Sequence, residues 1–286
     1  MAVVIFAVSV LSLSIGAVVV PSFSDLTIRR RHVYSETTSF GSTDTLYLKG
    51  ARERREARLE GSSAKESSSA SITQCDQRRT VALNPELRLY AVSAMHDRLA
   101  LMWRRPTLPE ATGPEVVTTF DAVDTGERRN VGHYVARRVV STRTVDPSPG
   151  AVARAEASET DGWYIDLPGL GCFDGEEGSF LRAVNISAAG VRDRERYVTK
   201  RSARRGFALE ETTRTTYAGH TSVSRVELIE VAEKPLDPAL FEIPHDYRAA
   251  LPLFRGGYDL TKPDTVANRL HAYWNDLASA AHSFFR

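Results

Sequence analysis

Residues 45–56, TLYLKGARERRE, decide the fold class of this chain. Leu46 and Leu48 fall on one face of an extended segment, because successive side chains of a strand point to opposite faces. Thr45, Tyr47 and Lys49 fall on the other face. This period of two predicts a β-strand. We expect the strand to continue to Leu59, with Gly50 marking a bulge or bend within it.

The same alternation, interrupted by turn residues, recurs along most of the chain. Turn chemistry at Asn84-Pro85-Glu86 and at Asp124-Thr125-Gly126-Glu127 predicts reversals between neighbouring strands. The sequence therefore predicts a mainly β (α+β) fold whose strands are mostly antiparallel. Further strands are expected at 26–34, 72–76, 80–83, 87–92, 116–123, 132–144, 152–167, 197–200, 206–217 and 221–232.

Two helical segments are expected near the end of the chain. Asp237-Pro238 is a helix start, because aspartate accepts from the free amides and proline suits the first helical position; a single turn should end near Phe241. A longer amphipathic helix is predicted over 262–284, capped by Thr261. Its apolar stripe either docks onto the β domain or contacts a membrane surface, although the polar face is not strongly basic. The stripe consists of Val266, Leu270, Trp274, Leu277 and Ala281.

The first 24 residues indicate export. Residues 2–20 form an unbroken run of apolar and small residues, and Ser22 and Ser24 provide a small-x-small cleavage site before Asp25. The segment is either a signal peptide or, because it is nearly long enough to cross a bilayer, a retained N-terminal anchor that associates the protein with the membrane. In both cases we expect a periplasmic or cell-envelope location.

Composition and spacing predict one β domain over residues 25–248, followed by a tail over 249–286. With 42% hydrophobic and 26% charged residues, the 286-residue chain has the composition of a globular protein. The serine-rich stretch 61–71 cannot bury a core and is expected to be a flexible loop within the domain.

Neither charge nor motifs indicate nucleic-acid binding or catalysis. The formal net charge is +1 and the arginine doublets are scattered among acidic residues, so no basic stripe is formed. The sequence contains no HExxH, GxSxG, P-loop, Rossmann glycine pattern or CxxC, and its seven histidines lack metal-ligand spacing. We therefore expect a non-catalytic protein without a metal or other cofactor.

The chain contains two cysteines, Cys75 and Cys172. In an oxidising compartment an even number favours a disulfide. The alternative is two separately buried thiols, which behave as small apolar side chains.

Three blocks, taken in order, resemble an uncharacterised family of exported bacterial proteins that is grouped by fold with the LolA/LolB-like lipoprotein carriers. The resemblance covers roughly residues 25–248, and the order of the blocks is more specific than any one of them. It implies a strongly curved antiparallel half-barrel sheet around short helices, with an apolar concave face that holds acyl chains. The blocks are residues 45–56 with 72–80 and Asn84-Pro85, residues 160–167, and residues 236–244 with Tyr247.

An incompletely closed barrel leaves room for an apolar or lipidic ligand. Eight apolar residues at alternate positions of the expected strands are candidates for the wall of such a site: Leu46, Leu48, Val81, Leu83, Leu89, Trp163, Ile165 and Leu167. The alternative is that they are core residues of a fully packed structural or protein-interaction module, since buried apolar faces are the default.

The disulfide can be tested directly. Protein prepared from the envelope without reductant should not react with a thiol-alkylating reagent, and peptide mass spectrometry should find Cys75 and Cys172 in one cross-linked species. Alkylation of both cysteines in that preparation would exclude the bridge.

Overall fold

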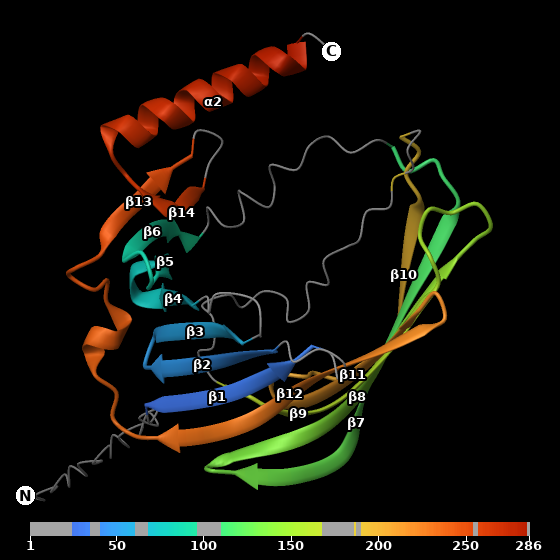
Figure 1. The fold of residues 1–286 in the computed structure, drawn as a ribbon. Coiled ribbons are helices and arrows are strands. Elements are labelled where there is room, and N and C mark those ends of the chain that lie inside the picture. The colour runs from blue at the N-terminus through green and yellow to red at the C-terminus, as the bar shows by residue number, and fades with distance from the viewer. Residues whose placement is uncertain are drawn as a thin grey trace, which may run out of the picture.

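A computed structural model describes residues 25–34, 41–60, 68–95, 110–167, 186, 190–253 and 257–284, with side chains described as far as residue 275. Within these residues the chain forms one sheet of fourteen strands, two short 3-10 helices and one α-helix (Figure 1). The first six strands are β1 (Leu26–Val33), β2 (Gly41–Lys49), β3 (Arg52–Glu60), β4 (Ser68–Gln74), β5 (Arg79–Asn84) and β6 (Leu89–Ala94). The next six are β7 (Glu115–Val131), β8 (Tyr134–Pro147), β9 (Glu156–Ile165), β10 (Arg194–Ser202), β11 (Phe207–Tyr217) and β12 (His220–Glu233). The remaining elements are η1 (Cys75–Gln77), η2 (Pro238–Phe241), β13 (Arg248–Pro252), β14 (Tyr258–Pro263) and α2 (Val266–Phe284).

The sheet is strongly curved and open. Its strand order is β10-β7-β8-β9-β11-β12-β1-β2-β3-β4-β5-β6-β13-β14, and Figure 1 shows its two halves bending around a common interior. The predicted mainly β, half-barrel architecture is therefore confirmed. Pairing is not antiparallel throughout, however, because β10 pairs with β7 and β13 pairs with β6 in parallel.

Two reversals lie elsewhere than the sequence suggested. The expected single strand through Gly50 is a hairpin of β2 and β3, in which Lys49 pairs with Arg52 and Gly50 adopts a φ of 56°. Glycine accepts this left-handed conformation at little cost, which suits a tight hairpin turn. The turn expected at residues 124–127 is a bulge inside β7, and the chain reverses at Gly132 instead.

The serine-rich stretch is also only partly a loop. Residues 68–71 belong to β4 and pair with β3, because the ladder supplies backbone partners that a serine-rich sequence does not specify by itself. Residues 61–67 and the export segment lie outside the described residues.

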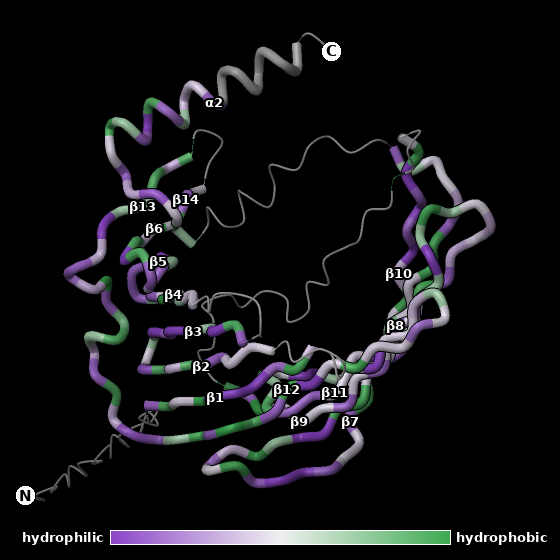
Figure 2. Tube along the Cα trace, in the orientation of Figure 1, coloured by the Kyte–Doolittle hydropathy of each residue, from purple (hydrophilic) through white to green (hydrophobic). Residues whose placement is uncertain are grey.

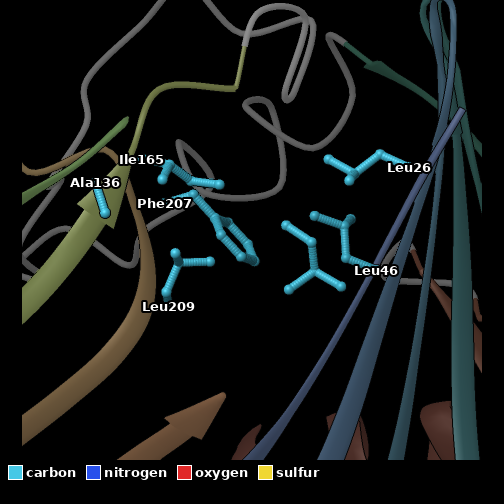
Figure 3. Close-up of a cluster of buried hydrophobic side chains, with 7 residues drawn as sticks. Leu26, Leu46, Ala136, Ile165, Phe207 and Leu209 are labelled. Atoms are coloured by element: carbon cyan, nitrogen blue, oxygen red, sulfur yellow. The ribbon is translucent and has the colours of Figure 1, made fainter. Parts of the chain in front are cut away.

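Alternation along β1 to β6 gives this half of the sheet an inner and an outer face. We define the inner face as the one that carries Leu26, Ile28, Leu46 and Leu48. Figure 3 shows Leu26 and Leu46 pointing across the interior toward Ile165, Phe207 and Leu209 of the other half. Together with Ala136 these side chains form the inner core, which joins the two halves where the sheet bends.

Over β4 and β5 the outer face is sealed by the segment around η2. Phe241 is fully buried against Ala70, Ile72, Val81 and Leu83 on β4 and β5, and these five residues form the outer core. The buried Gln74 side chain donates a 2.7 Å hydrogen bond to the carbonyl oxygen of Phe241.

The short helix that presents Phe241 begins where the sequence predicted. Asp237 accepts a hydrogen bond from the amide of Ala239, and Pro238 occupies the first helical position. The capped turn thus fixes Phe241 over the sheet.

The tail begins as an extension of the sheet and ends in a helix that projects away from it (Figure 1). The strand β13 starts at residue 248, the expected domain boundary, and β14 occupies the residues around Thr261, so α2 begins later than predicted. Thr265 accepts from the amide of Asn268 in the first turn of the helix. Trp274 is 66% exposed and Leu270 is also exposed, so the described side chains of the stripe do not dock onto the β domain, which was the first of the two alternatives.

Phe241 provides a test of the outer core. The substitution Phe241→Ala should lower the free energy of unfolding by about 4 kcal/mol, because it removes a fully buried ring and leaves a cavity over β4 and β5. Denaturant titration followed by circular dichroism measures the change. Leu87→Ala, at an exposed position in the β5–β6 turn, should change it by less than about 0.5 kcal/mol. Equal effects of the two substitutions would contradict this account of the core.

Candidate functional site

The inner face of β1 to β6 changes from apolar to hydroxyl-bearing across the strands. Strand register places side chains in rows perpendicular to the strands, and each row begins with leucine or isoleucine on β1 and β2. Beyond one charged residue on β3, the rows continue with small and hydroxyl-bearing side chains. The first row is Leu26, Leu48, Glu53, Thr73, Thr80 and Ser93, and the second is Ile28, Leu46, Arg55, Ser71, Ala82 and Ala91.

On β4 and β5 this face is more accessible than its opposite. On β4 and β5 the outer side chains Ile72 and Val81 are fully buried beneath Phe241, whereas the inner side chains Thr73, Thr80 and Ala82 are only half-buried. Figure 2 shows that polar and apolar residues are interspersed along the sheet. On these two strands the inner face is therefore the less completely buried one.

The eight residues expected to line a ligand site do not form one surface. Five of them belong to the inner core or pack against it: Leu46, Leu48, Trp163, Ile165 and Leu167. Val81 and Leu83 instead lie on the outer face against Phe241, and Leu89 packs with Ala91 and Ala250 near β13. Alternation indicates that a strand has an apolar face, but it does not tell which face turns inward, and on β5 the apolar face is the outer one.

A charged network crosses the interior beside the inner core. Arg30 Nη2 lies 2.7 Å from Asp44 Oδ2, and the ring of His32 hydrogen-bonds the other carboxylate oxygen. The Arg30 guanidinium stacks 4.2 Å from the centroid of the Phe207 ring and donates to the carbonyl oxygen of Ala208. Arg30 therefore ties β1 and β2 to β11 across the bend.

Asp44 is held in its ionised form by this network. Burial acts to raise the pKa of its carboxyl group, but the hydrogen bonds with His32 and Arg30 outweigh burial and hold the pKa below its ordinary value. Sequence reasoning missed this network, although Arg30 and His32 continue the alternation that begins at Leu26 and Ile28.

A second polar contact lies on β9 and β11. Tyr164 donates a 2.8 Å hydrogen bond to Glu211, and burial together with the charge of Glu211 raises the pKa of the phenol. The ring lies over Gly162, where an added Cβ would come within 2.8 Å of the tyrosine oxygen. Glycine at this position therefore leaves room for the buried phenol.

A cleft of about 540 Å³ lies over β8, β9, β11 and β12, but its lining is mainly charged. Arg138 makes two hydrogen bonds of 2.9 and 2.6 Å to Asp161 and a further contact to Glu127, so its charge is already satisfied. Trp163 is the one predicted wall residue that lines the cleft. The cleft is therefore not the apolar site that the sequence led us to expect.

No arrangement typical of a metal centre is found in the part of the chain that the structure describes: no group of three or more His, Cys, Asp or Glu side chains could hold an ion. Cys172 lies outside this part, so its bridge to Cys75 stays a prediction. None of the helices in the described ranges has the length and apolar character needed to cross a bilayer.

Comparison with known proteins does not assign the chain to a family. No protein-family model matches the sequence. No curated protein matches it either. The function must therefore be argued from the geometry of the chain itself.

The substitution Asp44→Asn should destabilise the protein by about 2 kcal/mol at neutral pH, because the buried Arg30 loses its charged partner. Asp44 has a lowered pKa in the folded state, so its contribution is complete above the unfolded pKa of about 4 and is lost as the pH falls through the folded value. Denaturation curves at a series of pH values should show the two proteins converging in acid.

The matched control is Asp121→Asn, which breaks a surface ion pair with the exposed Arg201. It should change stability at neutral pH by less than about 1 kcal/mol. A constant difference between wild type and Asp44→Asn down to strongly acidic pH would show that the charge of Asp44 is not the cause.

Proposed function

We propose that this chain is a non-catalytic cell-envelope protein that binds an apolar or lipidic ligand against the inner face of its half-barrel. The observation that carries the proposal is the difference between the two faces of β4 and β5. The outer face is closed by Phe241, while the inner face keeps half-buried side chains beside an apolar cluster. A concave, partly apolar surface with a few polar groups is the usual form of a small-molecule site.

The resemblance of three sequence blocks to exported proteins grouped with the LolA/LolB-like carriers supports the same class of function.

The position of α2 also supports ligand binding inside the half-barrel. A C-terminal helix that filled the half-barrel would exclude a ligand, but Trp274, at the centre of its stripe, is largely exposed to solvent. The described part of the helix therefore leaves the inner face unobstructed.

The second candidate is a structural or protein-interaction module of the envelope. Two observations favour it. The inner-core residues Ile28 and Leu209 are already fully buried without a ligand, and α2 presents exposed Val266, Leu270 and Trp274 as an unpartnered apolar stripe. A chain of this class would hold no ligand on its inner face, and the experiment below separates the two functions.

The full chain, purified from the envelope in mild conditions, should carry a co-purifying apolar ligand. Native mass spectrometry should find a mass adduct, and organic extraction should release the ligand. Protein that is ligand-free by both methods, and that does not bind an added fluorescent fatty-acyl probe, would leave the interaction module as the better account.

Leu48→Asn should weaken binding of the fluorescent probe about tenfold, because it places an amide on the half-buried apolar end of the inner face. Leu87→Asn changes the same residue type in the exposed β5–β6 turn and should leave binding unaltered. Unfolding curves of both variants ensure that affinities are compared between folded proteins. Equal affinity of Leu48→Asn and wild type would contradict binding at the inner face.

A further inference from the structure

Glu53 is an unusual residue on the inner face. It is 6% exposed and lies on β3 between Leu48 and Thr73 in the first row. One carboxylate oxygen accepts from the Nε of Arg55, while the other, Oε2, is buried and has no hydrogen-bond partner. A buried acceptor without a partner costs free energy, so such groups are rare in native proteins and call for an explanation.

A second unpartnered group lies in the same row. The hydroxyl oxygen of Thr80 on β5 is buried without a hydrogen bond. Register places Thr80 two strands from Glu53, with Thr73 between them, so the backbones at Glu53 and Thr80 are roughly 9–10 Å apart at ordinary strand spacing. Two unsatisfied polar atoms thus lie on one stretch of the inner face, next to its apolar end.

The charge of this stretch restricts the chemistry of its ligand. Arg55 pairs with Glu53, so the pair carries no net charge that would recruit a cation. An anionic headgroup is disfavoured as well, because it would bring acceptors against the free carboxylate oxygen. Because a hydroxyl group is both a donor and an acceptor, one hydroxyl of a polyol can donate to Glu53 Oε2 while another exchanges hydrogen bonds with Thr80.

We propose that the inner face binds an uncharged amphiphile with a polyol headgroup. The headgroup displaces the protein atoms that cover Glu53 Oε2 and the Thr80 hydroxyl, lies over Thr73 and Thr80 and donates a hydrogen bond to Glu53 Oε2. The alkyl chain extends toward Leu48. This inference rests on the proposed function and specifies its ligand class. The row from Leu48 through Glu53 to Thr80 provides an apolar end, a buried acceptor and a hydroxyl surface in the order that such a molecule requires.

Isothermal titration of the full chain with three probes of equal acyl length, each below its micelle concentration, tests the proposal. Monododecanoylglycerol carries hydroxyl donors, methyl dodecanoate carries none, and dodecanoate is anionic. Wild type should bind monododecanoylglycerol about tenfold more tightly than either of the others, the value of roughly one hydrogen bond to a buried acceptor.

Variants at Glu53 assign the preference to its free oxygen. Glu53→Leu should abolish the preference for monododecanoylglycerol while leaving the affinity for methyl dodecanoate within about twofold, because only the acceptor is lost. Glu53→Gln keeps a side-chain acceptor and should retain most of the preference. Glu56→Leu, on the opposite face of β3, is the matched control and should behave as wild type. Unfolding curves confirm that each variant is folded.

The outcomes separate this inference from the function on which it rests. If all three probes bind wild type equally and Glu53→Leu changes nothing, the inner face binds acyl chains but the polyol assignment is wrong. Tighter binding of dodecanoate than of monododecanoylglycerol would also overturn the assignment. If none of the probes binds, the proposed function itself fails.

Discussion

The packing of Leu26, Ile28 and Leu46 against Ile165, Phe207 and Leu209 is the contact on which the rest of the structure depends. It brings two halves of one continuous sheet face to face, which backbone hydrogen bonding between neighbouring strands does not do by itself. Arg30 reinforces the contact by stacking on Phe207 while it pairs with Asp44. Without this cluster the sheet would lose the apolar contact that holds its halves together.

Two of the irregularities in the ladder lie where the sheet bends. The β1–β12 register shifts between Arg29 and Arg30, and the β11–β9 register shifts between Ala208 and Glu210. Bulges of this kind increase local twist and bend the strand that carries them. The shifts lie beside the residues of the inner core, so backbone geometry and apolar burial favour the same curvature.

The sequence predicted what depends on local chemistry. The period of two around Leu46 and Leu48 predicted strands, and Asp237-Pro238 predicted a capped turn that ends at Phe241. It did not predict features that depend on distant partners. A glycine after an apolar strand fits a bend or a hairpin equally well, so Gly50 was misread, and the parallel pairing of β10 with β7 joins segments far apart in the chain. The face of β5 that turns inward depends on where Phe241 packs, which explains why Val81 was expected at a ligand wall and Glu53 was not considered.

The two open edges of the sheet have a consequence for the size of ligand that the proposed function would allow. In a closed barrel, strand number and shear fix the diameter. Here the sheet ends at β10 on one side and at β14 on the other, so no ring of hydrogen bonds sets the separation of its two margins. A small rotation about the bend would change that separation without breaking a ladder, so the binding function proposed above would not be restricted to ligands of one diameter.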